Sequence, residues 1–254
     1  MFESNNIPSN LINHLNSFKK LWVPNLWNKE NFMNYGVKSK IDIVPFGVDH
    51  DLFTIKKKSP IFTFLFVGVA IDRKNWRILY EVFNEEFKEK DTNLILKFDG
   101  KTNINIEEKH NIKIINQVLN DYEMADLYSI AHVVVLPSCA EGIGLPIIEG
   151  YSSGCRVLFT DAPFFDDFYS EKYSKKINVS YIGKPSNILK INSIHSESNF
   201  YYVSKEDLKK KMHLLKDEEK YNAAEASLIR EFSRNFSWRK SVIHAIRSIE
   251  SCTI

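Results

Sequence analysis

One stretch of the sequence decides the fold: Val133-Val134-Val135-Leu136-Pro137-Ser138-Cys139-Ala140-Glu141-Gly142-Ile143-Gly144-Leu145-Pro146-Ile147-Ile148-Glu149. Its first four residues form a short apolar run that is typical of a buried strand. The glycines that follow indicate a tight turn, and the proline suits the first turn of a helix. A strand, a turn and a helix in this order create a site where backbone N–H groups can face an anion.

Two carboxylates flank this turn. Glu149 lies about one turn into the expected helix, and helical side chains lean toward the N-terminus, so it can reach back toward a ligand in the turn. A carboxylate suits the vicinal hydroxyls of a ribose, and Gly142 and Gly144 let the backbone approach a phosphate or a sugar closely. Together with Glu141, the segment predicts a sugar nucleotide as the ligand. The glutamate pair alone does not decide this, since glutamate also complements a helix dipole.

Strands and helices alternate along the rest of the chain. Further apolar runs predict strands at residues 61–67, 94–98, 112–115 and 157–159. Asp72 is expected to cap a helix that carries Trp76, Leu79, Tyr80 and Phe83 on one face. Asn120 and Glu123 form a capping-box pattern before another helix. Helices are also expected from Ser204, over residues 218–234 and over residues 237–250, whereas residues 181–202 read as an irregular insertion.

This alternation predicts an α/β fold with a Rossmann-like parallel sheet and helices on both faces. In open sheets of this kind, ligands bind at the carboxyl ends of the strands. The loop of residues 68–74 and the loop of residues 138–144 both follow expected strands. We therefore expect the two loops to line one crevice.

Composition places the chain among ordinary globular proteins. It has 254 residues, 44% of them hydrophobic, and a formal net charge of +2. The near-balance of charge argues against a dedicated nucleic-acid binder, and the lysine triplets at residues 56–58 and 209–211 allow at most peripheral membrane contact. No apolar run is long enough to span a membrane, and the N-terminus does not read as a signal peptide, so a cytoplasmic location is expected. Three cysteines without ligand spacing predict neither disulfides nor zinc.

The opening segment resembles the signature of retaining glycosyltransferases of the GT-B class, especially glycosyltransferase family 4. The resemblance continues in Ile43-Val44-Pro45-Phe46-Gly47-Val48-Asp49, Phe64-Leu65-Phe66-Val67-Gly68, Asp72-Arg73-Lys74-Asn75, Arg156-Val157-Leu158-Phe159-Thr160-Asp161 and Phe236-Ser237-Trp238. It implies that residues 46–254 are the nucleotide-sugar-binding domain with its C-terminal helices, the second half of a GT-B fold. Residues 1–45 would be a remnant of the acceptor domain and the inter-domain linker, with most of that domain missing.

The resemblance also assigns roles to individual residues. It implies that Arg73 and Lys74 stabilise the leaving diphosphate, and that Glu141 contacts hydroxyls of the donor sugar. The expected donor-binding residues are Gly68, Val118, Gly142, Ile143, Gly144, Leu145 and Glu149. Val118 would lie beside the base, and Glu149 would bind the ribose. Two positions depart from the family pattern: Val69 replaces a frequent arginine, and Ile143 replaces a frequent aromatic residue.

A glycosyltransferase that moves a hexose from a nucleoside diphosphate sugar to an unknown acceptor, with retention, is the expected function. The alternatives are a non-catalytic nucleotide-sugar-binding or regulatory subunit, a fragment that needs a partner, and a sugar epimerase of the same fold. No cofactor is expected. No metal is expected either, because Asp49-His50-Asp51 stands where the resemblance implies an inter-domain turn far from the phosphates. A homodimer or a separate acceptor-domain protein is the expected partner, since apolar residues of the first 45 should be exposed: Leu21, Trp22, Val23 and Trp27. The last helix should pack on this part or on another subunit through Trp238, Val242, Ala245 and Ile249.

Overall fold

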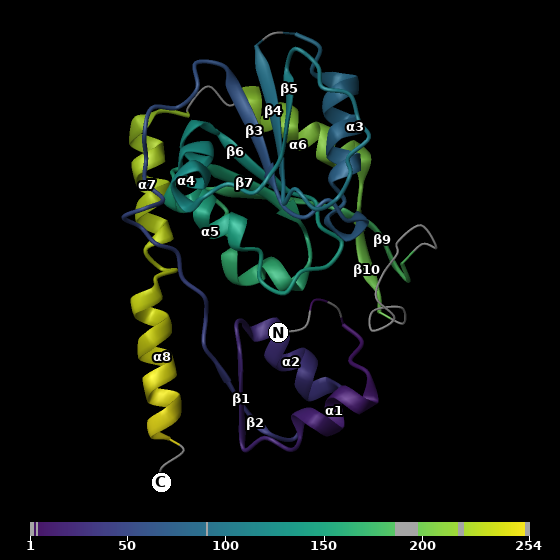
Figure 1. The fold of residues 1–254 in the computed structure, drawn as a ribbon, viewed down its shortest axis with the longest axis vertical. Coiled ribbons are helices and arrows are strands. Elements are labelled where there is room, and N and C mark those ends of the chain that lie inside the picture. The colour runs from purple at the N-terminus through teal and green to yellow at the C-terminus, as the bar shows by residue number, and fades with distance from the viewer. Residues whose placement is uncertain (1–2, 4, 90, 186–197, 218–220, 252–254) are drawn as a thin grey trace.

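The structure, a computed structural model, describes residues 3, 5–89, 91–185, 198–217 and 221–251. Its centre is a parallel sheet of six strands in the order β5-β4-β3-β6-β7-β8 (Figure 1). The strands are β3 (Phe62–Val67), β4 (Thr92–Phe98), β5 (Ile112–Asn116), β6 (Val133–Leu136), β7 (Arg156–Thr160) and β8 (Ser174–Ile177). The Rossmann-like α/β fold and all five strands expected for this sheet are thereby confirmed.

Helices cover both faces of this sheet because successive strand residues point to opposite sides. On one face Phe64 and Phe66 pack against α3 (Trp76–Glu86) and α6 (Lys205–Asp217). On the other face Leu65 and Val134 pack with α4 (Asp121–Ile130), α5 (Leu145–Ser152) and α7 (Ala223–Ser233). The β6 side chains are completely buried, as expected for a strand covered on both sides.

Residues 9–43 form a small separate unit below the sheet (Figure 1). It contains α1 (Ser9–Leu15), β1 (Lys20–Val23), α2 (Leu26–Asn34) and β2 (Lys40–Ile43), with β1 and β2 paired in parallel. The unit has its own core, which includes Val23, Phe32 and Ile41. The side chains of Trp22 and Val23 were both expected to be exposed. This is right for Trp22, which is 46% exposed, and wrong for Val23, which is 2% exposed. Leu21 and Trp27 are partly buried.

The last helix, α8 (Trp238–Glu250), runs from the sheet domain to this unit (Figure 1). It meets β1 and β2 through a polar contact: Trp22 Nε1 donates to Ser248 Oγ at 2.8 Å, and Ser248 Oγ donates to Asp42 at 2.6 Å. The expected packing on the first 45 residues therefore exists, but serines make it. The apolar side chain of Val242 is 54% exposed.

Two local expectations about secondary structure need correction. Asp72 does not cap α3: it opens a short 3-10 turn, η1 (Asp72–Lys74), and the helix begins after Asn75, which adopts a left-handed conformation. The segment read as irregular contains β9 (Val179–Gly183) and β10 (Phe200–Val203), which pair antiparallel, while its residues 186–197 lie outside the described residues. The helix expected over residues 218–234 corresponds to α7, and the first three residues of that expected range, 218–220, also lie outside the described residues. The capping box of Asn120 and Glu123 is confirmed.

A second 3-10 segment, η2 (Pro163–Phe168), follows β7 and faces α2. Among the described helices, none combines the length and the apolar character that a membrane span requires.

Candidate donor-binding site

The site lies where the order of the sheet reverses. The chain leaves β3 toward β4 and β5, then returns to the other side of β3 with β6, so the loops after β3 and β6 separate at a topological switch point. Ligands of open α/β sheets bind in the crevice at such a point. A hydrogen bond from the Cys139 amide to the Arg73 carbonyl, at 2.8 Å, ties the two loops together. The loops of residues 68–74 and 138–144, which were predicted to line one site, therefore lie next to each other.

The turn before α5 presents backbone donors. Gly144 has a φ of 76°, and a Cβ there would come within 2.6 Å of the Phe165 ring, so glycine is required on both counts. Among the described residues, no acceptor takes a hydrogen bond from the amides of Gly142, Ile143, Gly144 and Leu145. These donors lie at the N-terminus of a helix, where the partial charge is positive. The turn can thus receive an anion or sugar hydroxyls.

Four predicted or neighbouring side chains form a compact ionic cluster beside this turn. Glu141 Oε1 accepts hydrogen bonds from Lys74 Nζ at 2.5 Å and from Ser138 Oγ at 2.8 Å. Arg73 Nη1 lies 3.6 Å from Glu141 Oε2 and donates to the Ala140 carbonyl at 2.6 Å. The side chain of Glu141 is only 4% exposed, and those of Arg73 and Lys74 are 11% and 14% exposed. The three predicted catalytic residues therefore meet at one place.

The cluster keeps Glu141 ionised. Burial alone would raise the pKa of this carboxyl, but the charges of Lys74 and Arg73 and the hydrogen bonds from Lys74 and Ser138 outweigh burial and hold the pKa below its ordinary value. An ionised carboxylate can only accept hydrogen bonds. Glu141 can therefore accept hydrogen bonds from the hydroxyls of a bound sugar.

Glu149 has a different environment. Tyr128 on α4, completely buried, donates its phenolic hydrogen to Glu149 Oε2 at 2.5 Å. Burial raises the pKa of Glu149; the hydrogen bond from Tyr128 lowers it in part, and the charge of Asp121 raises it further. The two glutamates at the ends of the signature thus have pKa values shifted in opposite directions.

Residues from the part of the chain before β3 also reach the site. Glu3 Oε2 lies 2.8 Å from Arg73 Nη2, so a carboxylate occupies part of the guanidinium that was predicted to bind phosphate. Asn25 and Asn28, both buried at the start of α2, donate to the Gly142 carbonyl at 2.9 and 3.0 Å. Because the peptide is trans, fixing this carbonyl turns the next N–H, that of Ile143, the opposite way.

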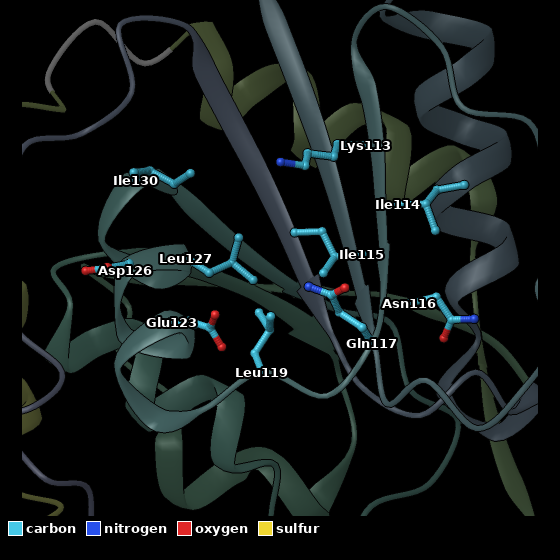
Figure 2. Close-up of a pocket in the computed structure, with 10 residues that line it drawn as sticks. All are labelled: Lys113, Ile114, Ile115, Asn116, Gln117, Leu119, Glu123, Asp126, Leu127 and Ile130. Carbon is cyan, nitrogen blue, oxygen red and sulfur yellow. The ribbon is translucent and has the colours of Figure 1, made fainter.

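Two further predicted donor-binding residues follow the carboxyl ends of β3 and β5. The amide of Gly68 donates to the Lys97 carbonyl at 3.0 Å, so it extends the pairing of β3 with β4. Val118 is 78% exposed in the loop between β5 and α4. Its neighbours Gln117 and Leu119 line a cavity of about 540 Å³ between β5 and α4. Figure 2 shows Ile115 from the strand and Leu127 from the helix facing this space.

The acidic segment Asp49-His50-Asp51 and the cysteine Cys139 have local structural roles. Asp49 Oδ1 accepts from the amides of Asp51 and Leu52, so this acidic segment caps its own turn. Among the described residues, no group of three or more histidine, cysteine, aspartate or glutamate side chains could hold a metal ion. Burial raises the pKa of Cys139 to about 12, which keeps this thiol protonated.

Sequence reasoning did not identify Tyr128, Ser138, Glu3, Asn25 or Asn28. The only available signal was at Asn25, a preferred N-cap residue directly before a helical segment. Its capping role is present, since its side chain accepts from the Asn28 amide.

The comparisons agree with this fold. Residues 61–173 match the family described as glycosyl transferases group 1. The chain is 31% identical over 143 residues to the O-antigen chain mannosyltransferase RfbU of Salmonella typhimurium, an alignment that covers 52% of this chain and 39% of that protein. The sequence likeness to glycosyl transferases group 1 thus covers residues 61–173 of this chain.

Solved structures extend the likeness to the whole described fold. A sucrose-phosphate synthase from Thermosynechococcus elongatus matches with a TM-score of 0.73 at 13% identity, over 96% of this chain and 60% of that one. A glycosyltransferase from Rickettsia africae matches with a TM-score of 0.71 at 17% identity, over 98% of this chain and 68% of that one. Anabaena Alr3699/HepE, solved with UDP and glucose, matches with a TM-score of 0.68 at 13% identity, over 95% of this chain and 65% of that one. The fold is that of the GT-B glycosyltransferases, and the chain spans 39% of the curated relative's length.

Proposed function

We propose that the crevice between the loops after β3 and β6 binds a nucleoside diphosphate sugar, and that the protein transfers the hexose to an acceptor with retention. The observation that carries this proposal is the cluster of Arg73, Lys74 and Glu141 beside the free amides of the turn before α5. Cations and amide donors complement a diphosphate, and an ionised carboxylate complements sugar hydroxyls.

The names of similar proteins support the same reading. The Salmonella relative is a mannosyltransferase, and the Anabaena structure contains UDP and glucose. In the proposed complex, Glu149 binds the ribose hydroxyls, and the base lies near Val118 at the mouth of the cavity between β5 and α4. The amides of residues 142–145 contact the sugar and the phosphates.

The electrostatic part of the reaction follows from the proposed pose. Negative charge grows on the diphosphate as the glycosidic bond breaks, and the guanidinium of Arg73 and the ammonium of Lys74 oppose it. The leaving phosphate itself accepts the acceptor's proton, so that no protein nucleophile is required. Since two cations already face the diphosphate, we propose that neither a divalent metal nor a cofactor is required. A cytoplasmic location stays a prediction.

A non-catalytic nucleotide-sugar-binding subunit is the second candidate. The specific observation in its favour is the pairing of Arg73 with Glu3, which holds a carboxylate against the proposed phosphate cation. In that case the protein binds the donor and a partner, a second copy or an acceptor-domain protein, is needed for transfer.

Calorimetry with UDP, GDP and ADP in the presence of EDTA tests donor binding. One nucleotide should bind best, and Glu149→Ala should weaken it by roughly 1.5–3 kcal/mol because charge-assisted hydrogen bonds are lost. Glu231→Ala, an exposed change on α7, is the control. Absence of binding, or equal binding by Glu149→Ala, contradicts the site; loss under EDTA that magnesium restores contradicts metal independence. Release of hexose or its transfer from the bound donor distinguishes the enzyme from the binding subunit.

A further inference from the structure

A second cavity, of about 500 Å³, lies between α2 and the start of η2. Six side chains around it are aromatic, amide or acidic: Trp27, Tyr35, Asn5, Asn31, Asn34 and Glu30. Pro163, the first residue of η2, forms the opposite wall. The volume falls within the range of roughly 300–1,000 Å³ that small-molecule sites occupy.

The polar lining comes from one face of a helix. Trp27, Glu30, Asn31 and Asn34 are spaced by three, four and seven residues, so they share one face of α2. The helix buries Phe32 on another side, in the core of the N-terminal unit. A face that only had to pack against η2 would be apolar. Here a single aromatic ring packs, and the amides and the carboxylate line the cavity.

Neighbouring contacts hold two walls of the cavity in place. The ring of Trp27 meets the ring of Phe164 edge-on, with centroids 5.7 Å apart and planes at 75°. Asn5 Oδ1 accepts a hydrogen bond from the Asn199 amide at 2.8 Å. A site whose side chains are already oriented loses less conformational entropy when a ligand binds.

The lining has the chemistry of a saccharide site. Asparagine amides both donate and accept, as hydroxyl groups do, and glutamate accepts. The apolar faces of Trp27 and Tyr35 can pack against the C–H faces of a pyranose. The described lining residues include no lysine or arginine, so the cavity does not suit a phosphate or a nucleotide.

The two elements that form the cavity, α2 and η2, also contact the proposed donor loop. Asn25 and Asn28, on the first turn of the same helix, hold the Gly142 carbonyl. Phe165 lies on η2, the element that forms the other wall, and its ring is so close to Gly144 that a Cβ there would come within 2.6 Å of it. A ligand between α2 and η2 is therefore bounded by two elements that both contact the donor loop.

We propose that this cavity binds a saccharide portion of the acceptor, a neutral pyranose unit next to the donor loop. This assignment rests on the proposed function, because only glycosyl transfer gives a saccharide at this position the role of acceptor. It makes Trp27, Asn34 and Glu30 ligand-binding residues, and it gives the N-terminal unit a part in selecting the acceptor.

Saturation-transfer NMR on the full chain tests this site, with mannotriose, maltotriose and chitotriose as probes. At least one trisaccharide should bind, and Asn34→Ala and Glu30→Ala, both at exposed positions, should each weaken it at least threefold. Trp27→Ala should abolish saccharide binding while UDP affinity stays within twofold of wild type. Trp238→Ala, on exposed α8, is the matched control and should change neither.

The outcomes separate this proposal from the proposed function. If no trisaccharide binds, or if Asn34→Ala and Glu30→Ala bind it as wild type does, the cavity is not a saccharide site, whatever the result with UDP. If a trisaccharide binds in the Trp27-dependent way but UDP does not bind, the saccharide site stands and the donor site is wrong.

Discussion

Tyr128 donates its phenolic hydrogen to the carboxylate of Glu149, with 2.5 Å between the oxygens. The hydrogen bond uses Oε2 and leaves Oε1 of Glu149 for another donor. Phe53 packs edge-on against the Tyr128 ring, with centroids 5.6 Å apart, so the phenol is held in place. The proposed ribose-binding carboxylate is thus positioned by a residue 21 positions earlier in the chain.

Tyr128→Phe should weaken UDP binding about fivefold to tenfold, since a hydrogen bond to a charged group contributes roughly 1.5 kcal/mol. It should also shift the pH dependence. The affinity for UDP should rise with pH as Glu149 ionises. The hydrogen bond from Tyr128 lowers the pKa of Glu149, so its loss raises this pKa and moves the rise in affinity to higher pH. Calorimetry from pH 5 to pH 8 measures both effects.

Tyr151→Phe is the control for Tyr128→Phe. Tyr151 lies on α5 as Glu149 does, is equally buried, and donates to the Phe168 carbonyl instead. Its removal should leave the pH profile unchanged. An unchanged profile in Tyr128→Phe as well would mean that Glu149 does not bind the nucleotide in its ionised form.

Lys74→Ala should destabilise the fold by about 3 kcal/mol, because it leaves the buried carboxylate of Glu141 without its nearest cation. The double variant Lys74→Ala with Glu141→Gln should recover most of this loss, since the buried charge is removed, but should not recover UDP binding. Urea unfolding and calorimetry give the two quantities. A double variant as unstable as the single one would show that Lys74 acts through packing rather than charge.

The sequence predicted those parts of the fold whose signal is local. Strand β6 is a continuous apolar run, and the capping box of Asn120 and Glu123 lies within four residues. Strand β8, Ser174–Ile177, was missed because its sequence, Ser-Lys-Lys-Ile, has no apolar run. It lies at the edge of the sheet, where it pairs with β7 and buries Ser174 and Ile177 but leaves its two lysines partly exposed.

The candidate site, like the fold, was predictable only where its residues lie in short local sequence patterns. Glu141, Glu149, Arg73 and Lys74 lie in two short segments that follow strands, so a parallel sheet brings them together. The contacts of Glu3 with Arg73 and of Asn25 with Gly142 join residues 70 and 117 positions apart. No local pattern encodes such pairs, because they depend on how the N-terminal unit packs against the sheet.

Glu3→Gln should strengthen UDP binding by about twofold, because the ion pair with Arg73 competes with the diphosphate and partly exposed pairs contribute up to roughly 1 kcal/mol. The gain should shrink as salt rises. Glu30→Gln makes the same charge change in α2, away from Arg73, and is the control. Weaker binding by Glu3→Gln would indicate that Glu3 supports the position of Arg73 instead of competing for it.

His132 should make stability sensitive to mild acid. Burial first, and then the charges of Lys58 and Arg156, lower its pKa to about 4. The unfolded chain, with an ordinary pKa near 6.5, binds the proton first as the pH falls, so stability present above pH 6.5 is lost between about pH 6.5 and pH 4. At pH 5 this loss is about 2 kcal/mol.

His132→Asn isolates this contribution. The neutral ring accepts a hydrogen bond from the Thr63 amide at 3.1 Å, and the asparagine carbonyl can accept it instead without titrating. Between pH 7 and pH 5, wild type should lose about 2 kcal/mol more unfolding free energy than the variant. Equal losses would mean that His132 is protonated in the folded protein at pH 5.

Helix α8 should show an inverted pattern of sensitivity, with its serine face more sensitive than its apolar face. Ser248→Val removes the hydroxyl that joins Trp22 to Asp42 in a partly buried contact, and should destabilise the protein by roughly 1–2 kcal/mol. Val242→Ser, at a side chain that is 54% exposed, should change stability by less than about 0.5 kcal/mol. Urea unfolding at two protein concentrations measures both variants. A loss in Val242→Ser that grows at the higher concentration would show that a second copy of the chain covers this face.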